Sequence, residues 1–309
     1  MKKTLKRKKI LVTGGAGFIG SNLIKNLLRD GHKIIVIDNL TTGSSDNLKT
    51  VRKEIKFIRS SVGKVLSTKE LKGIDGIFHI GIPSSSPLYK KDHQLVSEAI
   101  SDFISILELA KREKCKMVFA SSSSVYNGNK IPYKETQPVF VKDFYTEARY
   151  AMERLSRLYY DFFGVKSIGL RFFSVYGPGE ESKKNLANLV SQFLWEMKKN
   201  KAPIIYGQGK QERDFTYIED IIRGLKMAMD SKIDCDIFNL GTGKYHNLNQ
   251  LVEILNKVLN KNLPAVYVKN TVKNYIDRQM ADTNKAEKIL GFKAKISLEQ
   301  GIRKMSKIN

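Results

Sequence analysis

The chain of 309 residues is 41% hydrophobic and long enough to bury a large core, so we expect one large globular domain or two unequal lobes that share a cleft. No apolar run reaches the roughly 18 to 20 residues of a membrane span, and the two cysteines lack the paired spacing of a disulfide framework or a zinc site. The formal net charge of +23 is spread over the chain, which favours polyanionic small substrates, and no known nucleic-acid-binding motif accompanies it. We therefore expect a protein of the reducing cytoplasm, with no membrane partner and no main nucleic-acid partner.

Residues 8–38 predict a βαβ unit: a strand, a glycine turn, an amphipathic helix and a second strand. Gly14, Gly17 and Gly20 stand between the first strand and the helix, where glycines permit a tight turn and let the backbone approach a pyrophosphate at the helix N-terminus. Asp38 ends the second strand, where an acid can accept a hydrogen bond from a ribose 2′-OH and repel a 2′-phosphate. The unit therefore predicts a dinucleotide site that prefers NAD to NADP.

Further short apolar runs follow at "IKFI", "GIFHI", "KMVFAS" and "KSIGLRFF", each too short for a helix. Apolar residues at helical spacing lie between the later runs, over residues 94–112 and 144–163. Strands that alternate with helices indicate a parallel sheet. The fold class that we predict is α/β, a doubly wound Rossmann sheet.

The order of elements becomes mixed after "SVYGPGEESKK". We expect a helix over residues 185–199, short strands at "APIIYG" and "DFTYI", a helix that ends at Met229, and a strand at "DIFNLG". The expected division is an NAD-binding domain over residues 1–173, to which parts of 214–240 return, and a smaller, discontinuous substrate lobe over most of 174–309.

Four consecutive serines, Ser121 to Ser124, follow the predicted strand "KMVFA". Ligands bind at strand ends in an open parallel sheet, so a hydroxyl at this place can hydrogen-bond a substrate alcohol or ketone. When the serines are taken alone, a plain polar turn is the better explanation of them.

Tyr145 and Arg149 are four residues apart in the predicted helix over residues 144–163, so both can face the same place. A fixed cation near a phenol stabilises the phenolate. A tyrosine tuned in this way can take a proton from a sugar hydroxyl as hydride leaves the carbon, and return it later. Without other context, two such residues are usually a structural face of a helix.

Together these stretches resemble the extended short-chain dehydrogenase/reductases, and within them the NAD-dependent nucleotide-sugar epimerases of the UDP-glucose 4-epimerase type. The resemblance covers nearly the whole chain. It is carried by "VTGGAGFIGSNL", "VIDNLTTG", "FHIG", "VFASSSSVY", "DFYTEARYAMERL", "LRFFSVYGPGE", "IIYGQGKQERDFTYIEDI", "FNLGTG" and "ADTNKAEKILGFKAKISLEQGI".

The resemblance implies a role for each of the chemically active residues. Tyr145 resembles the catalytic tyrosine, Ser122 the catalytic hydroxyl with Ser123 as second choice, and Arg149 stands at the place of the family's lysine. The implied reaction is oxidation of a UDP-hexose at C4 by NAD, rotation of the 4-keto intermediate, and hydride return to its opposite face. The enzyme would be an isomerase without net redox change.

The resemblance also implies the binding residues. The expected NAD contacts are Gly14, Gly17, Phe18, Ile19, Gly20, Asp38, Asn39, Thr42, Ser61, Val62, Ile80, Gly81, Ile82, Tyr145, Arg149 and Phe172. The expected contacts with the UDP-sugar are Ser84, Ser122, Ser174, Asn188, Leu189, Tyr206, Arg213 and Lys273, and the segment Ile204 to Tyr206 would pass beside the uracil.

Several residues depart from the family pattern. Arg149 keeps a positive charge but is too basic to relay a proton, and Ala99 stands where an asparagine often supports the catalytic lysine's water, so the relay is expected to be rebuilt around Arg149. Ser61 takes the place of an adenine-binding acid and Ser174 that of a substrate-facing asparagine. Lys273 is a candidate substitute for a missing arginine at the diphosphate.

Other readings stay open beside the epimerase. Dehydration is disfavoured, because Ser123 and Ser124 stand where dehydratases of the superfamily place an Asp-Glu pair. Arg149, Ala99 and Ser174 also suit another NAD-linked nucleotide-sugar reductase or dehydrogenase. A dinucleotide-sensing binding protein that has lost catalysis and carries a basic N-terminal arm is the alternative from a different class.

Three further expectations concern the partners of the chain. The two long predicted helices commonly pair across a two-fold axis in the family, so the resemblance implies a homodimer. Gln279 resembles the family's gate residue, and its intermediate size leaves open whether the sugar is N-acetylated. The four histidines are scattered along the chain, and no metal site is expected.

Overall fold

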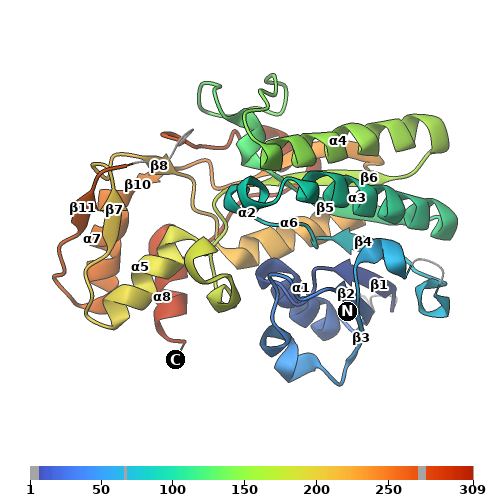
Figure 1. The fold of residues 1–309 in the computed structure, drawn as a ribbon, viewed down its shortest axis with the longest axis horizontal. Coiled ribbons are helices and arrows are strands. Elements are labelled where there is room, and N and C mark those ends of the chain that lie inside the picture. Colours follow the sequence, from blue (N-terminus) through green and yellow to red (C-terminus); the bar gives the residue numbers. More distant parts are fainter. Residues whose placement is uncertain (1–6, 66–67, 271–275, 309) are drawn as a thin grey trace.

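The computed structural model describes residues 7–65, 68–270 and 276–308. At its centre lies a seven-stranded sheet in the order β3-β2-β1-β4-β5-β6-β9, in which every pair of neighbours is parallel (Figure 1). The strands are β1 (Lys9–Thr13), β2 (Lys33–Asp38), β3 (Ile55–Arg59), β4 (Gly76–His79), β5 (Lys116–Ser122), β6 (Ser167–Phe172) and β9 (Cys235–Leu240). This confirms the predicted doubly wound Rossmann fold.

Helices cover both faces of the sheet, which is why its strands read as continuous apolar runs. Successive residues of a strand point to opposite faces, so that Val12 and Phe78 pack in one core while Leu11 and Ile77 pack in the other. The first core lies under α1 (Phe18–Arg29) and α6 (Ile218–Asp230), and the second under α2 (Ser86–Lys91), α3 (Gln94–Glu113) and α4 (Phe144–Phe163). Both long predicted helices are therefore present, as α3 and α4.

Five 3₁₀ helices interrupt the connections: η1 (Ser45–Val51), η2 (Val62–Lys64), η3 (Lys69–Leu71), η4 (Ser123–Tyr126) and η5 (Glu181–Leu186). The predicted helix over residues 185–199 is shorter than expected, because α5 (Leu189–Lys198) begins only after Asn188. The Asn188 side chain caps it by accepting a hydrogen bond from Val190 N at 3.0 Å. The capping asparagine has an extended backbone conformation, and its side chain bonds to the first turn, so the helix begins directly after it.

The remaining elements form a second group beside the sheet (Figure 1). β7 (Ile204–Tyr206) pairs in parallel with β11 (Val266–Val268), and β8 (Glu212–Arg213) pairs antiparallel with β10 (His246–Asn247). The helices of this group are α5, α7 (Leu248–Leu259), the π-helical turn η6 (Ala286–Leu290) and α8 (Leu298–Ser306). Because α6 and β9 follow β8 in sequence, the chain leaves the central sheet after β6 and later returns to it. The boundary at residue 173 stays a prediction.

The expected strand at "DFTYI" is wrong. Only an isolated bridge between Tyr217 and Tyr176 forms in this segment. Asp214 is completely buried and accepts hydrogen bonds from Thr242 N at 2.8 Å, Gly243 N at 3.0 Å and Ala281 N at 3.1 Å. The backbone of the segment bonds to residues 174–176, with Thr216 N donating to Ser174 O at 3.3 Å and Tyr176 N donating to Thr216 O at 3.1 Å, but this pairing is too short to form a strand.

Candidate active site

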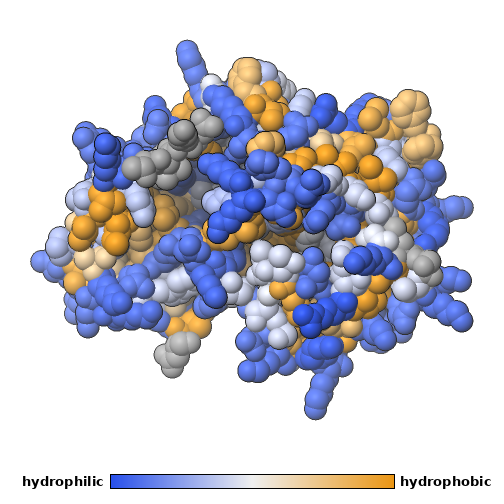
Figure 2. Space-filling model, viewed as in Figure 1, coloured by the Kyte–Doolittle hydropathy of each residue, from blue (hydrophilic) through white to orange (hydrophobic). Residues whose placement is uncertain are grey.

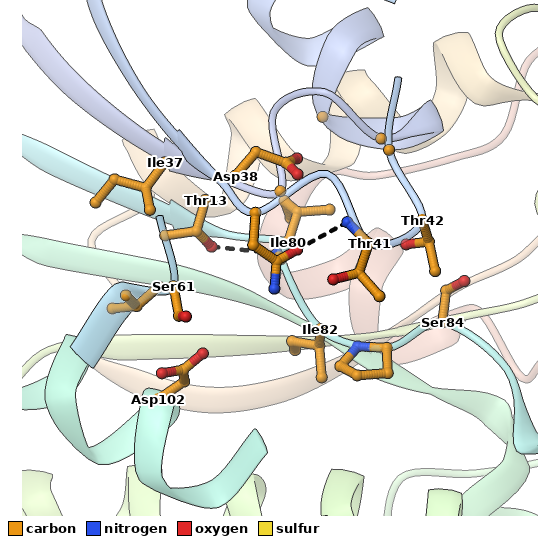
Figure 3. Close-up of a pocket in the computed structure, with 18 of the residues that line it drawn as sticks. Thr13, Ile37, Asp38, Thr41, Thr42, Ser61, Ile80, Ile82, Ser84 and Asp102 are labelled. Atoms are coloured by element: carbon orange, nitrogen blue, oxygen red, sulfur yellow. Dashed lines mark hydrogen bonds between the residues drawn. The ribbon is translucent and has the colours of Figure 1, made fainter. Parts of the chain in front are cut away.

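A cavity of about 220 Å³ opens at the carboxyl ends of β1, β2 and β4 (Figure 3). In the sheet register Thr13, the last residue of β1, pairs with Ile37 on one side and His79 on the other. The chain runs from β1 outward to β2 and β3 and then crosses back to β4, so this is the point where the strand order reverses. Open parallel sheets bind ligands at such a point.

Most of the expected NAD contacts line this cavity. They are Gly14, Gly17, Phe18, Ile19, Gly20, Asp38, Asn39, Thr42, Ser61, Val62, Ile80, Gly81 and Ile82, and Ser84 from the expected substrate contacts joins them. Tyr145, Arg149 and Phe172 do not line the cavity itself. The structure therefore gathers thirteen of the sixteen expected NAD contacts in one cavity, and Arg149 reaches a residue of its lining through a hydrogen bond to Pro83 O.

The glycine turn between β1 and α1 fits a pyrophosphate. Gly14 has a φ of +67°, which favours glycine, and a Cβ there would collide with the backbone of Gly81. A Cβ on Gly17 would come within 3.2 Å of Gly14 O. No side chain caps α1 and no acid lies in its first turn, so the positive end of the helix dipole faces the cavity.

Asp38 is fixed by the backbone around it. Its Oδ2 accepts a hydrogen bond from Ala16 N at 2.9 Å and its Oδ1 one from Leu40 N at 2.8 Å. Burial raises the pKa of this carboxyl, and the two backbone hydrogen bonds oppose that rise. A carboxylate offers about four acceptor positions, so Asp38 can still accept a hydrogen bond from a ribose hydroxyl.

Sequence reasoning missed two acids on the wall of the cavity, Glu98 and Asp102, which come from α3. They share a helix face with Leu95 and Ala99, because the four residues follow the three- and four-residue spacing of a helix. Ala99 was already expected near the catalytic relay, so its helical neighbours could have been found by counting along the same face.

Tyr145 lies in the first turn of α4, two residues after the capping residue Asp143, whose Oδ1 accepts a hydrogen bond from Thr146 N at 2.7 Å. Its ring meets the buried ring of Tyr89 edge-on, with the centroids 5.7 Å apart. The guanidinium carbon of Arg149 lies 4.8 Å from the Tyr145 ring centroid. Tyr145 and Arg149, one helical turn apart, are therefore in direct contact through the Tyr145 ring and the Arg149 guanidinium.

Arg149 is 4% exposed and donates a hydrogen bond from Nη2 to Pro83 O at 2.8 Å. Within the described part of the chain its Nε and Nη1 have no hydrogen-bond partner, and neither do the Tyr89 hydroxyl and His79 Nε2. Burial, reinforced by the charge of Arg149, lowers the pKa of His79 to about 3, so this imidazole is neutral at ordinary pH. A desolvated cation beside Tyr145 is the main electrostatic feature here.

The serines at the end of β5 have different bonding partners. Ser121 donates to Glu153 Oε1 at 2.6 Å, and Ser123 Oγ accepts from Gln279 Nε2 at 2.6 Å. Ser122 Oγ accepts a hydrogen bond from Ser124 N at 3.1 Å, which leaves its own proton to donate. Of the two candidates for the catalytic hydroxyl, Ser122 is the one not engaged with another side chain.

Gln279 connects the serines to the second group of elements. It is 7% exposed, and its Oε1 accepts a hydrogen bond from Ser174 Oγ at 2.6 Å while its Nε2 donates to Ser123. Ser174, with a φ of +31°, stands in a backbone conformation that is uncommon outside glycine. The expected gate residue is therefore held through both polar atoms of its side-chain amide.

The other expected substrate contacts lie in the second group of elements. Asn188 and Leu189 are at the start of α5, Tyr206 ends β7 with half of its surface exposed, and Arg213 in β8 donates from Nη1 to Glu212 O at 2.8 Å. Lys273 lies outside the described residues.

The described ranges contain neither a cluster of metal-ligating side chains nor a membrane-spanning helix. No group of three or more His, Cys, Asp or Glu side chains lies close enough together to hold a metal ion. None of the helices there is both long and apolar enough to cross a membrane.

The sequence profile of the NAD dependent epimerase/dehydratase family matches residues 10–241, three quarters of the chain. The chain belongs to this family. Its cofactor is NAD, and the glycine turn and Asp38 described above are suited to hold it. The resemblance to extended short-chain dehydrogenase/reductases is confirmed.

Relatives within the epimerase/dehydratase family differ in their reactions. A protein of Methanocaldococcus jannaschii provisionally named UDP-glucose 4-epimerase is 34% identical, with 96% of each chain covered. UDP-glucuronic acid decarboxylase 1 of Arabidopsis thaliana is 32% identical over 97% of this chain and 69% of its own length.

Solved structures show the same fold from end to end. The UDP-glucose 4-epimerase of Thermotoga maritima, solved with UDP-glucose, has a TM-score of 0.90 at 28% identity, with 96% of this chain and 97% of that chain covered. The UDP-glucuronic acid 4-epimerase of Bacillus cereus, solved with UDP-glucuronic acid and NAD, has a TM-score of 0.85 at 28% identity, with 96% and 98% covered.

Proposed function

We propose that the protein is a UDP-hexose 4-epimerase, with UDP-glucose and UDP-galactose or their N-acetylated forms as substrates. The observation that carries the proposal is the placement of Tyr145 over a buried Arg149 next to the NAD cavity, with the Ser122 hydroxyl at the end of β5. The names of the M. jannaschii relative and of the T. maritima structure support the same reaction.

In the proposed reaction Tyr145, as phenolate, takes the proton of the sugar 4-hydroxyl, and Ser122 donates a hydrogen bond to the same oxygen. NAD supplies an acceptor for the hydride that leaves C4 and a donor that returns it to the other face of the ketone. The Tyr145 phenol then gives its proton back to the C4 oxygen. Arg149 stabilises the phenolate through its charge, which burial keeps from being screened by water.

Dehydration has less support, because Ser123 and Ser124 supply no acid and no base beside Ser122. The alternative NAD-linked reductase or dehydrogenase draws on Arg149 and Ala99, which replace two members of one relay. It differs from an epimerase in a measurable way, since it changes NADH stoichiometrically with substrate.

The decisive experiment is an anomeric-proton NMR time course without added reductant, with UDP-galactose, UDP-N-acetylgalactosamine and UDP-glucuronic acid in separate tubes. We expect conversion to the C4 epimer in the first or second tube without net change in NADH absorbance. Tyr145→Phe should lower the rate by at least about a hundredfold while the protein still binds NAD. No epimer in any tube, or an unchanged rate in the Phe variant, would refute the proposal, and a pentose product in the third tube would indicate decarboxylation.

We also propose a homodimer that buries α3 and α4. Exposed apolar side chains gather on these helices, namely Ile104, Leu158, Phe162 and Phe163. Figure 2 shows hydrophobic side chains gathered over the C-terminal end of α4, at the upper right. Multi-angle light scattering that gives the mass of one chain at micromolar concentration would contradict the dimer.

A further inference from the structure

The two ends of the NAD cavity can be told apart from the residues at each end. The helix α1 faces the middle of the cavity and receives the pyrophosphate, and Asp38 at the end of β2 receives the ribose of the adenosine half. Tyr145 and Arg149 mark the side of the reacting ring. The adenine ring, attached to the ribose at Asp38, must therefore lie beyond Asp38, toward η2 and the end of β3.

Asp102 lies at this adenine end. Figure 3 shows Asp102 and Ser61 together at one end of the cavity and Ser84 and Thr42 at the other. Oδ1 of Asp102 accepts a hydrogen bond from Gly63 N at 3.2 Å, which ties the carboxylate to η2. The neighbouring Val62 is 3% exposed and gives the same end an apolar wall.

The carboxylate of Asp102 has a hydrogen-bonding capacity that the protein does not use up. Among the described residues, the Gly63 amide is the one group that donates a hydrogen bond to it, and no cation is paired with it. Burial raises the pKa of this carboxyl, and only that backbone amide opposes the rise. A partly buried carboxylate with unused acceptor positions can take a further hydrogen bond from an N–H donor of a ligand.

The adenosine half of NAD brings one exocyclic N–H group to this end of the cavity, the 6-amino group of adenine. We propose that Asp102 accepts a hydrogen bond from this amino group and so makes the site selective for adenine. Ser61, which lines the same end of the cavity, offers a hydroxyl and no carboxylate there. The inference rests on the use of NAD and is independent of which sugar reaction the enzyme catalyses.

Glu98 provides a matched control on the same helix. It lies one turn before Asp102, nearer to α2, and also lines the cavity. Burial is the main cause of the raised pKa of Tyr89, which packs against Tyr145, and the charge of Glu98 adds to that rise. Glu98 therefore faces the reacting end. Its substitution should not alter discrimination at the adenine ring.

The test is a competition between NAD and nicotinamide hypoxanthine dinucleotide, in which a carbonyl oxygen replaces the 6-amino group. The purified protein is incubated with an equimolar mixture, desalted and denatured, and the released dinucleotides are quantified by liquid chromatography and mass spectrometry. The analogue lacks the N–H group that would bond to the charged carboxylate, so we expect the wild type to retain at least about ten times more NAD than analogue. Asp102→Asn should lower that ratio by roughly tenfold, since its amide can donate to the carbonyl. Glu98→Gln should keep the wild-type ratio.

Two outcomes would overturn the inference. One is an Asp102→Asn ratio within about twofold of the wild-type ratio in a protein whose thermal unfolding is unchanged. The other needs no variant: a wild type that retains both dinucleotides equally has no acceptor for the amino group. Epimerase activity enters neither readout, so failure here and failure of the proposed reaction are separate results.

Discussion

Arg149 poses the sharpest question at the scale of single residues. Its guanidinium is buried beside Tyr145 and faces no carboxylate among the described side chains, and a single backbone carbonyl, Pro83 O, accepts from it. Burying a cation without an anion costs free energy. Such a cost is retained where the charge has a function, and in the proposed reaction that function is to stabilise negative charge on the Tyr145 oxygen.

Arg149→Lys should therefore fail to improve epimerisation, although lysine is the usual residue of the family. The shorter ammonium cannot reproduce the planar arrangement of donors at Pro83, and Ala99 offers no amide to hold a relay water. We expect an initial rate at or below the wild-type rate, by up to about tenfold, in the NMR assay. The double variant Arg149→Lys with Ala99→Asn is the control, and it should exceed the single variant. A clear gain from Arg149→Lys alone would contradict a relay rebuilt around arginine.

The sequence alone predicted which residues line the cavity where a local backbone motif forms the binding site. Gly14, Gly17 and Asp38 carry their function in a local motif, so their place in the cavity follows from spacing. Asp102 is different, because its side chain reaches the cavity only through the packing of α3 against η2. The spacing of apolar residues in one helix predicts which face of the helix is buried, but it does not predict which atom of a ligand that face contacts.

At the scale of elements, β5, α4 and β6 are joined by a buried ion pair. Arg171 donates from Nε to Glu153 Oε1 at 2.8 Å and from Nη2 to Oε2 at 2.6 Å, and both side chains are about 95% buried. Ser121 donates to the same carboxylate, so the strand end that carries Ser122 is fixed by this pair. The ion pair thus acts as a support for the proposed catalytic hydroxyl.

Removing one partner of this pair should destabilise the fold strongly. Glu153→Gln leaves the buried Arg171 charge uncompensated, so we expect the free energy of unfolding in urea to fall by about 3 kcal/mol or more. Glu196→Gln is the matched control, because Glu196 pairs with Lys199 and Lys201 at 3.8 Å on the surface, and it should cost less than about 1 kcal/mol. Equal losses in the two variants would mean that the buried pair has no special role.

The error at "DFTYI" shows what an element prediction lacks. Alternation of polar and apolar residues indicates a strand only if a neighbouring strand is available to pair with it. Here Asp214, Phe215, Thr216 and Tyr217 are all buried, on both faces, and Asp214 binds backbone amides from distant segments. Those backbone amides come close to Asp214 only in the tertiary fold, so the local pattern of polar and apolar residues cannot predict them.

At the scale of the whole molecule, the buried His79 links stability to pH. Burial and then Arg149 lower its pKa to about 3, whereas in the unfolded chain it is near 6.5. Between these values the unfolded state binds one more proton than the folded state, so the stability contributed by neutral His79 is present above pH 6.5 and is lost as pH falls toward 3. Between pH 7 and pH 5 we expect urea unfolding to show a loss larger by about 2 kcal/mol in the wild type than in His79→Gln. The same loss in both proteins would show that His79 is protonated in the fold.

The strand order also governs how the protein can be made. β6 and its neighbour β9 are separated by about 60 residues of sequence, yet they pair along their whole length, from Ser167 with Cys235 to Phe172 with Leu240. At synthesis rates of roughly 5 to 20 residues per second, the outer edge of β6 stays open for several seconds after it leaves the ribosome. An open, apolar sheet edge invites pairing with other chains. During this period the nascent chain already contains the glycine turn and the serine loop, but its sheet still lacks β9. Slower translation between residues 172 and 240 would prolong the exposure of the β6 edge and so the need for chaperones.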